Sequence, residues 1–294
     1  MPRKYEDTIV LFDKTPPDIL CPHFIELRWA FGCQFDCAWC YLQGTGYGNK
    51  VFRAYSLPQI LAHLQRFFQE NRAFSKSQKH LLDVRPRIIV NSGELSDSYP
   101  NHPNIRAIMD AFAKQDRYKL LLLTKTADPQ SLLETHRRNV VYSVTVNAEP
   151  VASRWELGAP KPLDRLKGLE AVLERGYETR VRIDPIVPVF GWRDAYAHMA
   201  RHINEVGPAR VTLGTLRGLQ RTLTFARIAG KDLAWTQYLQ EKTGWGLKMS
   251  PEKRREVYEF LMSRIDAPIA ICKETRILAA SLGFSDSMKC NCVD

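Results

Sequence analysis

Short apolar segments alternate with amphipathic segments from residue 24 to about residue 214, and this alternation restricts the fold more than any other feature of the sequence. The apolar segments have the length and β-branched content of strands, and the segments between them have the periodicity of helices. Strict alternation of the two predicts a parallel sheet with helices packed on it. Six such units suit either an open doubly wound sheet or an incomplete (β/α) barrel, and the pattern alone does not separate these folds.

The apolar segments predict strands at residues 24–31, 87–92, 119–124, 140–147, 177–186 and 210–216. Helices are expected at residues 57–71, 103–114, 162–175 and 194–206, and another opens at Asp128-Pro129, a capping residue and a first-turn proline. Beyond residue 218 follow helical segments at 232–242 and 251–265, a strand-like run PIAIC and a cysteine-bearing tail. No repeat or linker divides the chain, so we expect one compact domain with a C-terminal elaboration.

The charge balance favours an anionic partner. Lys and Arg total 42 against 32 for Asp and Glu, and the net charge of +10 attracts polyanions such as nucleic acid, although the basic residues are spread along the chain. The polar start MPRKYED and the shortness of the apolar runs predict a cytoplasmic protein without a membrane span. In a reducing compartment, seven cysteines indicate metal binding or catalysis instead of disulfides.

Three of the cysteines, Cys33, Cys37 and Cys40, form a CxxxCxxC motif directly after the first predicted strand. This position is the first βα loop, at the end of the sheet where such folds build active sites. Three thiolates hold three irons of a [4Fe–4S] cluster and leave the fourth iron free to bind another molecule. Structural zinc would require a fourth ligand, and no paired CxxC or HxxxH partner is present. The nearby His23 is better explained as a packing or surface residue.

Aromatic residues, Trp39 and Tyr41, flank the last cysteine, and the motif resembles the signature of the radical S-adenosylmethionine enzymes. The resemblance implies an α/β fold, a partial (β/α)6 barrel of the TIM type over residues 1–216, with residues 217–294 as a C-terminal extension packed on it. It implies a [4Fe–4S] cluster, S-adenosylmethionine and an electron donor such as flavodoxin or ferredoxin. In this family the open iron chelates S-adenosylmethionine, and a 5′-deoxyadenosyl radical formed from it abstracts hydrogen from the substrate.

The resemblance also implies residues that bind S-adenosylmethionine. The second strand runs into NSGELSD, where Gly93-Glu94 is similar to the latter half of a GGE motif that family members use on the substrate amino group. An acidic side chain suits an ammonium group, so Glu94 is expected there, with Ser96 as a second candidate. Glu94 and Tyr41 are the candidate catalytic residues.

Further candidates lie at the ends of the third and fourth strands. Lys125, in LLTKT, is expected to pair with the methionine carboxylate, and Thr145 and Asn147 are expected to hydrogen-bond the ribose or carboxylate. Each of them could also be an ordinary polar loop residue. Their position at strand ends favours a functional role.

The order of several motifs is similar to the spore photoproduct lyase-like branch of this family, over about residues 33–216. Members of that branch act on a methyl-bridged thymine dimer in DNA, which agrees with the basic charge. The implied substrate is a 5-substituted thymine or related base in DNA, extruded from the duplex or single-stranded. The motifs are CYLQGT, Ser96-Asp97, Thr124-Lys125, Thr145 to Asn147, and RLKGLEAVLERGYETRVRIDPIVP followed by Gly191-Trp192.

The chain departs from that branch at Glu94. Lyases of the branch carry a cysteine at this place, near the serine of the second-strand motif, which returns a hydrogen atom to the product radical. A carboxylic acid is a very poor hydrogen-atom donor, so the substrate radical would take its hydrogen back from 5′-deoxyadenosine. Such a redox-neutral reaction suits an isomerase, for example one that rearranges an aminoacyl-thymine in base hypermodification, and both repair and modification stay open.

The cysteine-bearing tail predicts a second metal site. Cys272, Cys290 and Cys292, with Cys21 as the remaining thiol, are expected to bind an auxiliary iron–sulfur cluster or a zinc ion. The alternative is a flexible tail with incidental thiols.

Four arginines on or after the last two strands are candidate phosphate contacts, or else solvated surface. They are Arg180, Arg182, Arg217 and Arg221.

Two other functions stay open on the sequence alone. One is a radical enzyme that acts on a peptide or small molecule, and the other is a non-catalytic zinc-binding nucleic-acid module.

Overall fold

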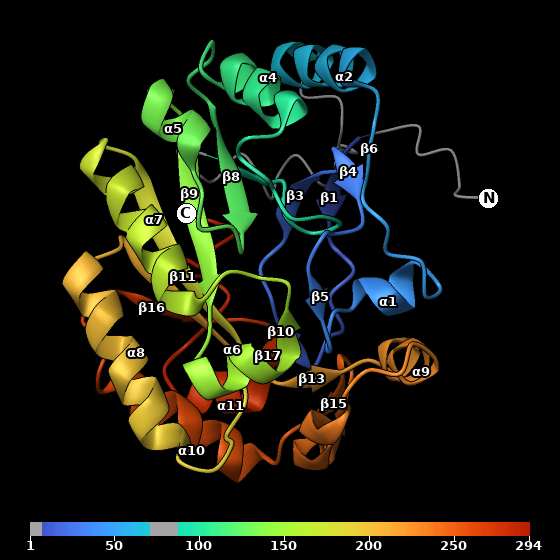
Figure 1. Ribbon diagram of the computed structural model, residues 1–294, viewed down its shortest axis with the longest axis vertical. Coiled ribbons are helices and arrows are strands. Elements are labelled where there is room, and N and C mark those ends of the chain that lie inside the picture. The colour runs from blue at the N-terminus through green and yellow to red at the C-terminus, as the bar shows by residue number, and fades with distance from the viewer. Residues whose placement is uncertain (1–7, 71–87) are drawn as a thin grey trace.

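A computed structural model describes residues 8–70 and 88–294, and its centre is an eight-stranded sheet that curls into a half-barrel (Figure 1). Neighbouring strands from β3 to β16 pair in parallel, while β1 joins the first edge antiparallel to β3. The predicted partial (β/α) barrel is therefore confirmed. In sheet order the strands are β1 (Ile9–Phe12), β3 (Phe24–Leu27), β7 (Ile88–Asn91), β8 (Tyr118–Thr124), β9 (Val140–Val146), β11 (Glu178–Ile186), β12 (Arg210–Thr215) and β16 (Ile269–Ile271).

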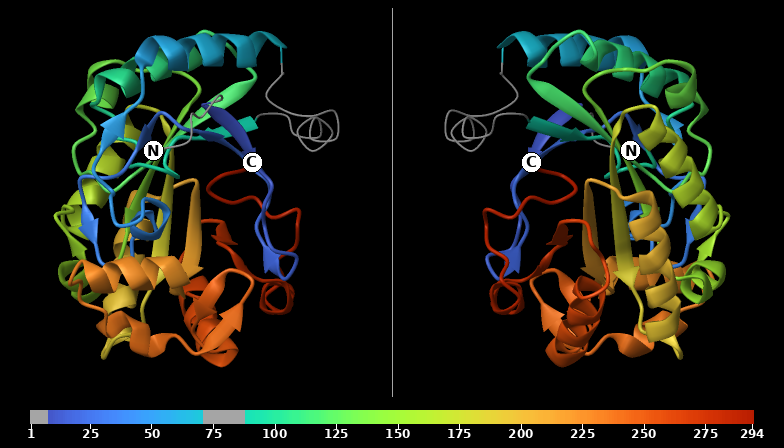
Figure 2. Two further views of the ribbon diagram at one scale, coloured as in Figure 1. Left: turned by 90° about the vertical axis from the view of Figure 1, so that its right-hand side faces the viewer. Right: turned by 90° about the vertical axis from the view of Figure 1, so that its left-hand side faces the viewer.

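Helices cover the outer face of this sheet, and the views in Figures 1 and 2 show the strands inside them. Each crossover between adjacent parallel strands carries at least one helix, as the alternating pattern predicts. The crossover helices are α1 (Leu42–Thr45), α2 (Leu57–Glu70), α4 (Pro103–Phe112), α5 (Gln130–Glu134), α6 (Glu149–Trp155), α7 (Pro162–Glu174) and α8 (Trp192–Val206), with α9 (Gln220–Ile228) and α10 (Pro251–Met262) after β12. A further helix, α11 (Arg276–Ser281), follows the last strand.

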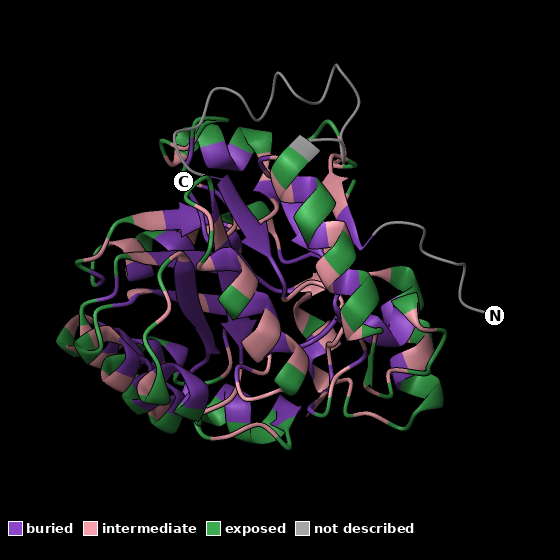
Figure 3. Ribbon diagram, turned by 90° about the horizontal axis from the view of Figure 1, so that it is seen from above, coloured by how far each residue is buried: buried purple, intermediate pink, exposed green. Residues whose placement is uncertain are grey.

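The core fills the space between the sheet and these helices. All seven residues of β9 are buried, which explains its continuous apolar sequence. The helices are amphipathic, and Figure 3 shows buried strands at the centre with exposed residues on the outer helix faces. Burial of a large aliphatic side chain contributes about 1.5–3 kcal/mol, so this layer accounts for much of the stability of the barrel.

The first predicted strand, residues 24–31, is two strands in the structure. After β3 the chain turns at Arg28 and Trp29, and β4 (Ala30–Phe31) pairs with β6 (Arg53–Ala54) outside the main sheet. The Trp29 side chain is fully buried and its indole N–H donates to the Ser92 carbonyl at 3.1 Å. The second half of this apolar run, from Trp29 onward, therefore packs outside the main sheet and does not extend β3.

The predicted helix at 232–242 is wrong. A 3-10 turn at Ala234–Tyr238 is followed by a hairpin of β14 (Glu241–Thr243) and β15 (Gly246–Lys248). The 3-10 turn ends at Leu239, whose backbone is extended, and the pairing of β14 with β15 takes over from Glu241, so no helix continues to residue 242.

The strand-like run PIAIC is confirmed as β16, which forms one edge of the main sheet. The strand at the other edge, β1, and the crossover helix α6 had no prediction. The division of the chain at residue 216 remains a prediction, although its C-terminal part supplies β16. The segment MPRKYED and residues 71 and 87, the ends of a predicted helix and strand, lie outside the described residues.

The two edges of the sheet are linked by a short antiparallel pair. β2 (Ile19–Leu20) follows β1, β17 (Glu274–Thr275) follows β16, and the two pair across the opening. Figure 2 shows the red C-terminal segment beside the blue N-terminal one.

The chain then ends inside the barrel, at the amino-terminal end of the strands. Arg180 donates to the carbonyls of Cys290 and Asn291 at 3.1 and 2.9 Å, and Arg210 donates to that of Cys290 at 3.0 Å. The tail therefore closes this end of the barrel.

No helix in residues 8–70 or 88–294 combines the length and apolar character needed to cross a membrane.

Candidate active site

A cavity of about 380 Å³, here called the mouth cavity, opens at the carboxyl-terminal end of the parallel strands. The loops after β3, β7, β8 and β12 and the last residues of β9 and β11 contribute to its lining, so it lies where α/β barrels place active sites. Eleven of the candidate site residues proposed from the sequence line this cavity. They are Cys33, Cys37, Cys40, Tyr41, Gly93, Glu94, Ser96, Lys125, Thr145, Arg182 and Arg217.

The three loop cysteines, Cys33, Cys37 and Cys40, are positioned by backbone contacts on both sides of the loop. Gly32 has φ +87°, and a Cβ there would lie 2.3 Å from the Val51 carbonyl oxygen, so only glycine fits at the start of the loop. Further along, β5 (Asp36–Cys37) pairs with β10 (Glu156–Leu157), which fixes Cys37 against the crossover after β9.

The donor set of the loop cysteines fits a [4Fe–4S] cluster. All three are free thiols, with Cys37 buried and the other two half-buried. In residues 8–70 and 88–294, no three His, Cys, Asp or Glu side chains already close on a single ion. A cubane has a different requirement, because each iron takes one thiolate and the ligands stand around the cluster. Three thiolates would leave one iron open toward the mouth cavity.

Tyr99 contacts the first loop cysteine. Its hydroxyl donates to the Cys33 Sγ at 3.4 Å and accepts from the backbone N–H of Gln34 at 2.7 Å. Burial, with a further contribution from Asp97, raises the pKa of the Cys33 thiol to about 11, and the hydrogen bond from Tyr99 opposes this rise. A hydrogen bond to a ligand sulfur tunes a metal site. The sequence offered no signal for Tyr99, which lies 66 positions from Cys33.

Asp97 explains why the SD and TK dipeptides occur together. Its carboxylate accepts from the Thr124 hydroxyl, from the Lys125 backbone N–H at 2.8 Å and from the Tyr99 backbone N–H at 3.0 Å. These contacts tie the loop after β7 to the end of β8. The neighbouring Ser96 has a buried hydroxyl without a hydrogen-bond partner in the described part of the chain, which leaves it available to a ligand.

Lys125 is held by a buried acid. Its Nζ lies 3.5 Å from the Glu156 carboxylate, which is fully buried and accepts from Arg165 at 2.7 Å. Arg165 also donates to the Thr145 carbonyl at 2.8 Å. One carboxylate thus faces two cations, so its single negative charge does not balance both. The surplus positive charge lies at Lys125, beside the cavity. Glu156 and Arg165 were not found from the sequence, because they lie on the crossover after β9 and not at a strand end.

Asn147 lies apart from the mouth cavity. It is fully buried, its amide donates to the Pro185 carbonyl at 2.7 Å, and its Oδ1 accepts from the Tyr196 hydroxyl at 2.6 Å and the Ala148 N–H at 3.0 Å. These contacts use its hydrogen-bonding capacity to join β9 to β11 and α8. The structure therefore gives it a structural environment and does not bring it to the other candidates.

Glu94 stands between the mouth cavity and a smaller one deeper in the barrel. Its carboxylate accepts from the Asn91 amide at 3.1 Å and lies 3.8 Å from the Lys273 ammonium. Gly93 beside it approaches β8 so closely that a Cβ would lie 2.7 Å from that of Leu123. On the other side of the cavity Tyr41 remains 37% exposed.

A buried ion-pair group forms the wall near β11 and β12. Asp184 accepts two hydrogen bonds from Arg217, at 2.7 and 2.6 Å, and two from Arg182, through its Nε at 3.0 Å and its Nη2. Burial alone would raise the pKa of Asp184, but Arg217 and Arg182 hold it well below its usual range. Two guanidinium groups around one carboxylate leave a net positive wall, which suits an anionic substrate group.

The other two arginines proposed as phosphate contacts lie elsewhere. Arg180 is buried at the opposite end of the barrel, where it pairs with Glu178 and Asp294. Arg221 lies on α9 with its guanidinium over the Tyr47 ring, 4.8 Å from the ring centre. For Arg180 the prediction is wrong, because its donors are used by the tail.

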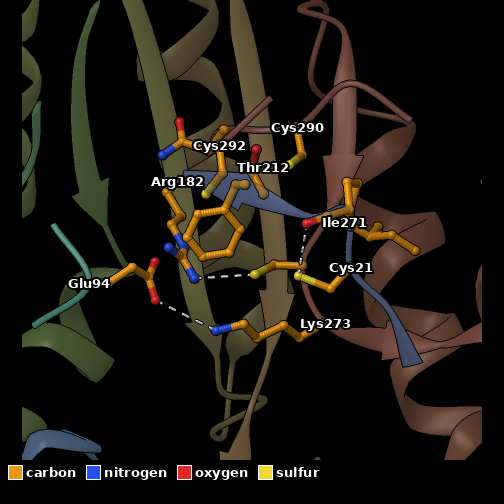
Figure 4. Close-up of a pocket in the computed structure, with 12 residues that line it drawn as sticks. Cys21, Glu94, Arg182, Thr212, Ile271, Lys273, Cys290 and Cys292 are labelled. Atoms are coloured by element: carbon orange, nitrogen blue, oxygen red, sulfur yellow. Dashed lines mark hydrogen bonds and ion pairs between the residues drawn. The ribbon is translucent and has the colours of Figure 1, made fainter. Parts of the chain in front are cut away.

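The remaining four cysteines, here called the interior cysteines, line the smaller cavity. They are Cys21, Cys272, Cys290 and Cys292, and Figure 4 shows three of them by label with Arg182 and Lys273 beside them. They come from three segments: the end of β2, the end of β16 and the tail. The structure thus brings together the set that the sequence proposed as a second metal site, and metal binding itself stays a prediction.

The fold and sequence of this chain match one group of known proteins. The family model for spore photoproduct lyase matches residues 23–258. The spore photoproduct lyase of Bacillus subtilis (strain 168) is 26% identical over 189 residues, which are 63% of this chain and 52% of that protein. That of Geobacillus sp. (strain Y412MC61) is 23% identical over 176 residues, 59% of this chain and 49% of that protein. The chain spans about half the length of these curated relatives.

Solved structures show the same fold. Spore photoproduct lyase complexed with dinucleoside spore photoproduct superposes with a TM-score of 0.68 at 18% identity, covering 88% of this chain and 78% of that one. Streptococcus suis SuiB bound to S-adenosylmethionine gives a TM-score of 0.53 at 15% identity, covering 87% and 52%. Because the family model covers most of the chain and the half-barrel with its three loop cysteines agrees with it, the chain belongs to the spore photoproduct lyase family.

Proposed function

We propose that the chain is a radical S-adenosylmethionine enzyme that acts on a thymine-type base in DNA. Cys33, Cys37 and Cys40 would hold a [4Fe–4S] cluster, whose open iron faces the mouth cavity. When bound, the cluster and S-adenosylmethionine supply a 5′-deoxyadenosyl radical able to remove a hydrogen atom from the substrate. The observation that carries the proposal is the convergence of these cysteines with unlike charges on one cavity.

The charges of the mouth cavity suit the amino-acid part of S-adenosylmethionine. The Glu94 carboxylate and the unpartnered Ser96 hydroxyl would bind its ammonium group, and Lys125 would pair with its carboxylate. Glu156 positions Lys125 for this contact. Thr145 lines the cavity and would hydrogen-bond the ribose or carboxylate, whereas Asn147 would act on the cavity wall only through β9.

The substrate side of the proposal rests on charge, aromatic surface and family. Arg182 and Arg217 would face a phosphate, and Phe35 and Trp245 offer flat surfaces for an extruded base. The net charge of +10 favours DNA. A structural relative is known with bound AdoMet and dinucleoside spore photoproduct, which supports a 5-substituted thymine as the substrate class.

Glu94 makes a redox-neutral reaction the form we favour. The carboxyl group does not donate hydrogen atoms, so the hydrogen removed from the substrate would return from 5′-deoxyadenosine to the rearranged radical. Each turnover would then regenerate S-adenosylmethionine, with no net oxidation or reduction of the substrate. An isomerase of a modified thymine fits this balance, and Tyr41 at the cavity rim would orient the base or relay the hydrogen.

Isotope transfer tests the proposal. Reduced protein is incubated without oxygen with S-adenosylmethionine, a one-electron donor such as flavodoxin, and oligonucleotides in which every carbon-bound hydrogen of the modified base is replaced by deuterium. One oligonucleotide carries the spore photoproduct and the other an aminoacyl-thymine. We expect deuterium in 5′-deoxyadenosine or S-adenosylmethionine with one of the two. Absence of transfer from both, in protein that cleaves S-adenosylmethionine, would contradict the DNA substrate.

The rival functions predict other outcomes of the same experiment. A radical enzyme for peptides or small molecules would cleave S-adenosylmethionine but would show no salt-sensitive binding to DNA. A zinc-binding nucleic-acid module would bind DNA, contain zinc without iron, and leave S-adenosylmethionine intact. Metal analysis of the purified protein therefore separates the second rival before any substrate is tested.

A further inference from the structure

The interior cysteines gather from distant parts of the chain around one enclosed space. Cys21 follows β2, Cys272 follows β16, and Cys290 and Cys292 belong to the tail, yet all four line the same cavity. This cavity, which eight other residues also line, has a volume of about 20 Å³, enough for one ion or water. Incidental thiols on a flexible tail would have no reason to converge in this way.

The tail is fixed in this position by hydrogen bonds from the barrel. Arg180 and Arg210 hold the backbone carbonyls around Cys290, and the Ser143 hydroxyl donates to the Asn291 side chain at 2.9 Å. These contacts come from three different strands. The two tail cysteines are therefore held within the barrel by groups that do not depend on sulfur chemistry.

Two donors already point at the sulfur atoms. The Arg182 Nη2 lies 3.2 Å from the Cys272 Sγ, and the Asn91 Nδ2 lies 3.4 Å from the Cys292 Sγ. Lys273 adds a second positive charge to the lining. Hydrogen-bond donors and cations around a set of cysteines stabilise thiolates, and thiolates are the form that binds thiophilic metals.

We propose that Cys21, Cys272, Cys290 and Cys292 are the four thiolate ligands of a second metal centre, separate from that of the loop cysteines. Four sulfur ligands suit zinc or an iron–sulfur cluster. The two differ in the space that they need. Zinc would enter the cavity once the sulfurs draw inward, whereas a cluster would require the cysteine side chains to rotate outward. The centre would lie beneath the mouth cavity, on the far side of Glu94 and Arg182.

Metal analysis of variants tests this proposal without any measurement of activity. The variant with Cys33, Cys37 and Cys40 all changed to alanine lacks the first site, and we expect it to retain metal after anaerobic reconstitution with iron, sulfide and zinc. Either zinc near one equivalent or iron with matching sulfide would identify the centre. Adding Cys290→Ala and Cys292→Ala should remove this metal. Lys289→Ala, in the exposed tail position between them and Met288, is the matched control and should retain it.

The result that overturns the proposal is a loop-cysteine variant that is folded but binds no zinc or iron. Far-UV circular dichroism and a cooperative thermal transition establish the fold. In a second experiment the loop cysteines are left intact. The single variants Cys21→Ser, Cys272→Ser and Cys292→Ser should then each contain less metal than the wild-type protein, by the same amount. Unequal losses, or none, would also overturn it. Because the readout is metal content, failure here leaves the proposed reaction untouched, and failure of the reaction leaves this site untouched.

Discussion

The two sets of cysteines occupy the same barrel but are assembled in opposite ways. The loop cysteines fall within eight residues of sequence, and one βα loop places them at the mouth. The interior cysteines come from both edges of the sheet and from the tail, and meet only when the barrel is complete. A local motif can be recognised by its spacing, whereas the second set exists only as a product of tertiary structure.

The largest effect should come from removing one loop cysteine. In Cys37→Ala, cleavage of S-adenosylmethionine by reduced protein should fall by more than about 10,000-fold, over 5 kcal/mol, because the cluster loses a ligand and its geometry. Product formation is followed by chromatography of 5′-deoxyadenosine, with Lys289→Ala as control. Retained cleavage would show that the loop does not hold the cluster. The proposed difference in role between the loop cysteines and the interior cysteines would then be wrong.

The interior set should depend instead on the anchors of the tail. Arg180→Met leaves Glu178 and Asp294 without their buried partner and releases two carbonyls, so the free energy of unfolding should fall by about 3–5 kcal/mol. Urea denaturation measures the change, and the exposed Arg175→Met serves as control. A loss below 1 kcal/mol would mean that the tail is not held as described.

The pH dependence of the free energy of unfolding tests how the loop after β16, which carries Cys272 and Lys273, is held in place. Lys248 is fully buried, and its ammonium donates to the Lys273 carbonyl at 2.7 Å. Burial lowers the pKa of Lys248 from 10.5 to about 8, with Glu274 opposing the shift. From pH 8 to 10.5 the unfolded chain therefore binds more protons than the folded one, and the free energy of unfolding rises with pH.

This rise amounts to up to about 3 kcal/mol. It is measured as the difference between wild type and Lys248→Met in urea denaturation at pH 7, 8, 9 and 10.5, since titrations common to both proteins cancel. The difference should favour wild type increasingly as the pH increases. A difference that does not change with pH would contradict the shifted pKa.

The smallest effect concerns the loop set. Tyr99→Phe removes the hydrogen bond to the Cys33 sulfur. When present, that hydrogen bond stabilises the reduced form of the cluster, because the reduced form has more electron density on its sulfur ligands. One hydrogen bond contributes about 1 kcal/mol, equivalent to about 40 mV for a one-electron couple, so the reduction potential should become more negative by about that amount. A redox titration followed by electron paramagnetic resonance reads the shift. Tyr238→Phe, away from the cavity, should leave the potential unchanged, and an equal potential in Tyr99→Phe would exclude the contact.

The same contrast explains what could be predicted from the sequence. The barrel and the loop cysteines follow from local periodicity and spacing, and the structure confirms the six strand and helix units. The failed helix at 232–242 shows the limit of local pattern, because a hairpin next to β13 (Arg217–Gly218) decided its conformation. Tyr99 and Glu156 reach the site through contacts that no single stretch of sequence records.

The strand-end candidates divide for a physical reason. Lys125 and Thr145 point into the cavity, while Asn147, two residues after Thr145, turns into the core and bonds to Tyr196. Alternation along a strand places neighbours on opposite faces, but Asn147 lies just past the end of β9, where alternation no longer applies. Only the structure could separate these two.

The pairing of β2 with β17 across the gap in the sheet links the width of the barrel to sulfur chemistry. Cys21 comes one residue after β2, and Cys272 two residues before β17. The pairing of these two strands therefore sets the distance between the two sulfur atoms. Any motion that spreads the open side, for instance to admit a bulky nucleotide, would pull these two thiols away from each other. Occupancy of the inner site and access from the open side would then be mechanically coupled through a pair of two-residue strands.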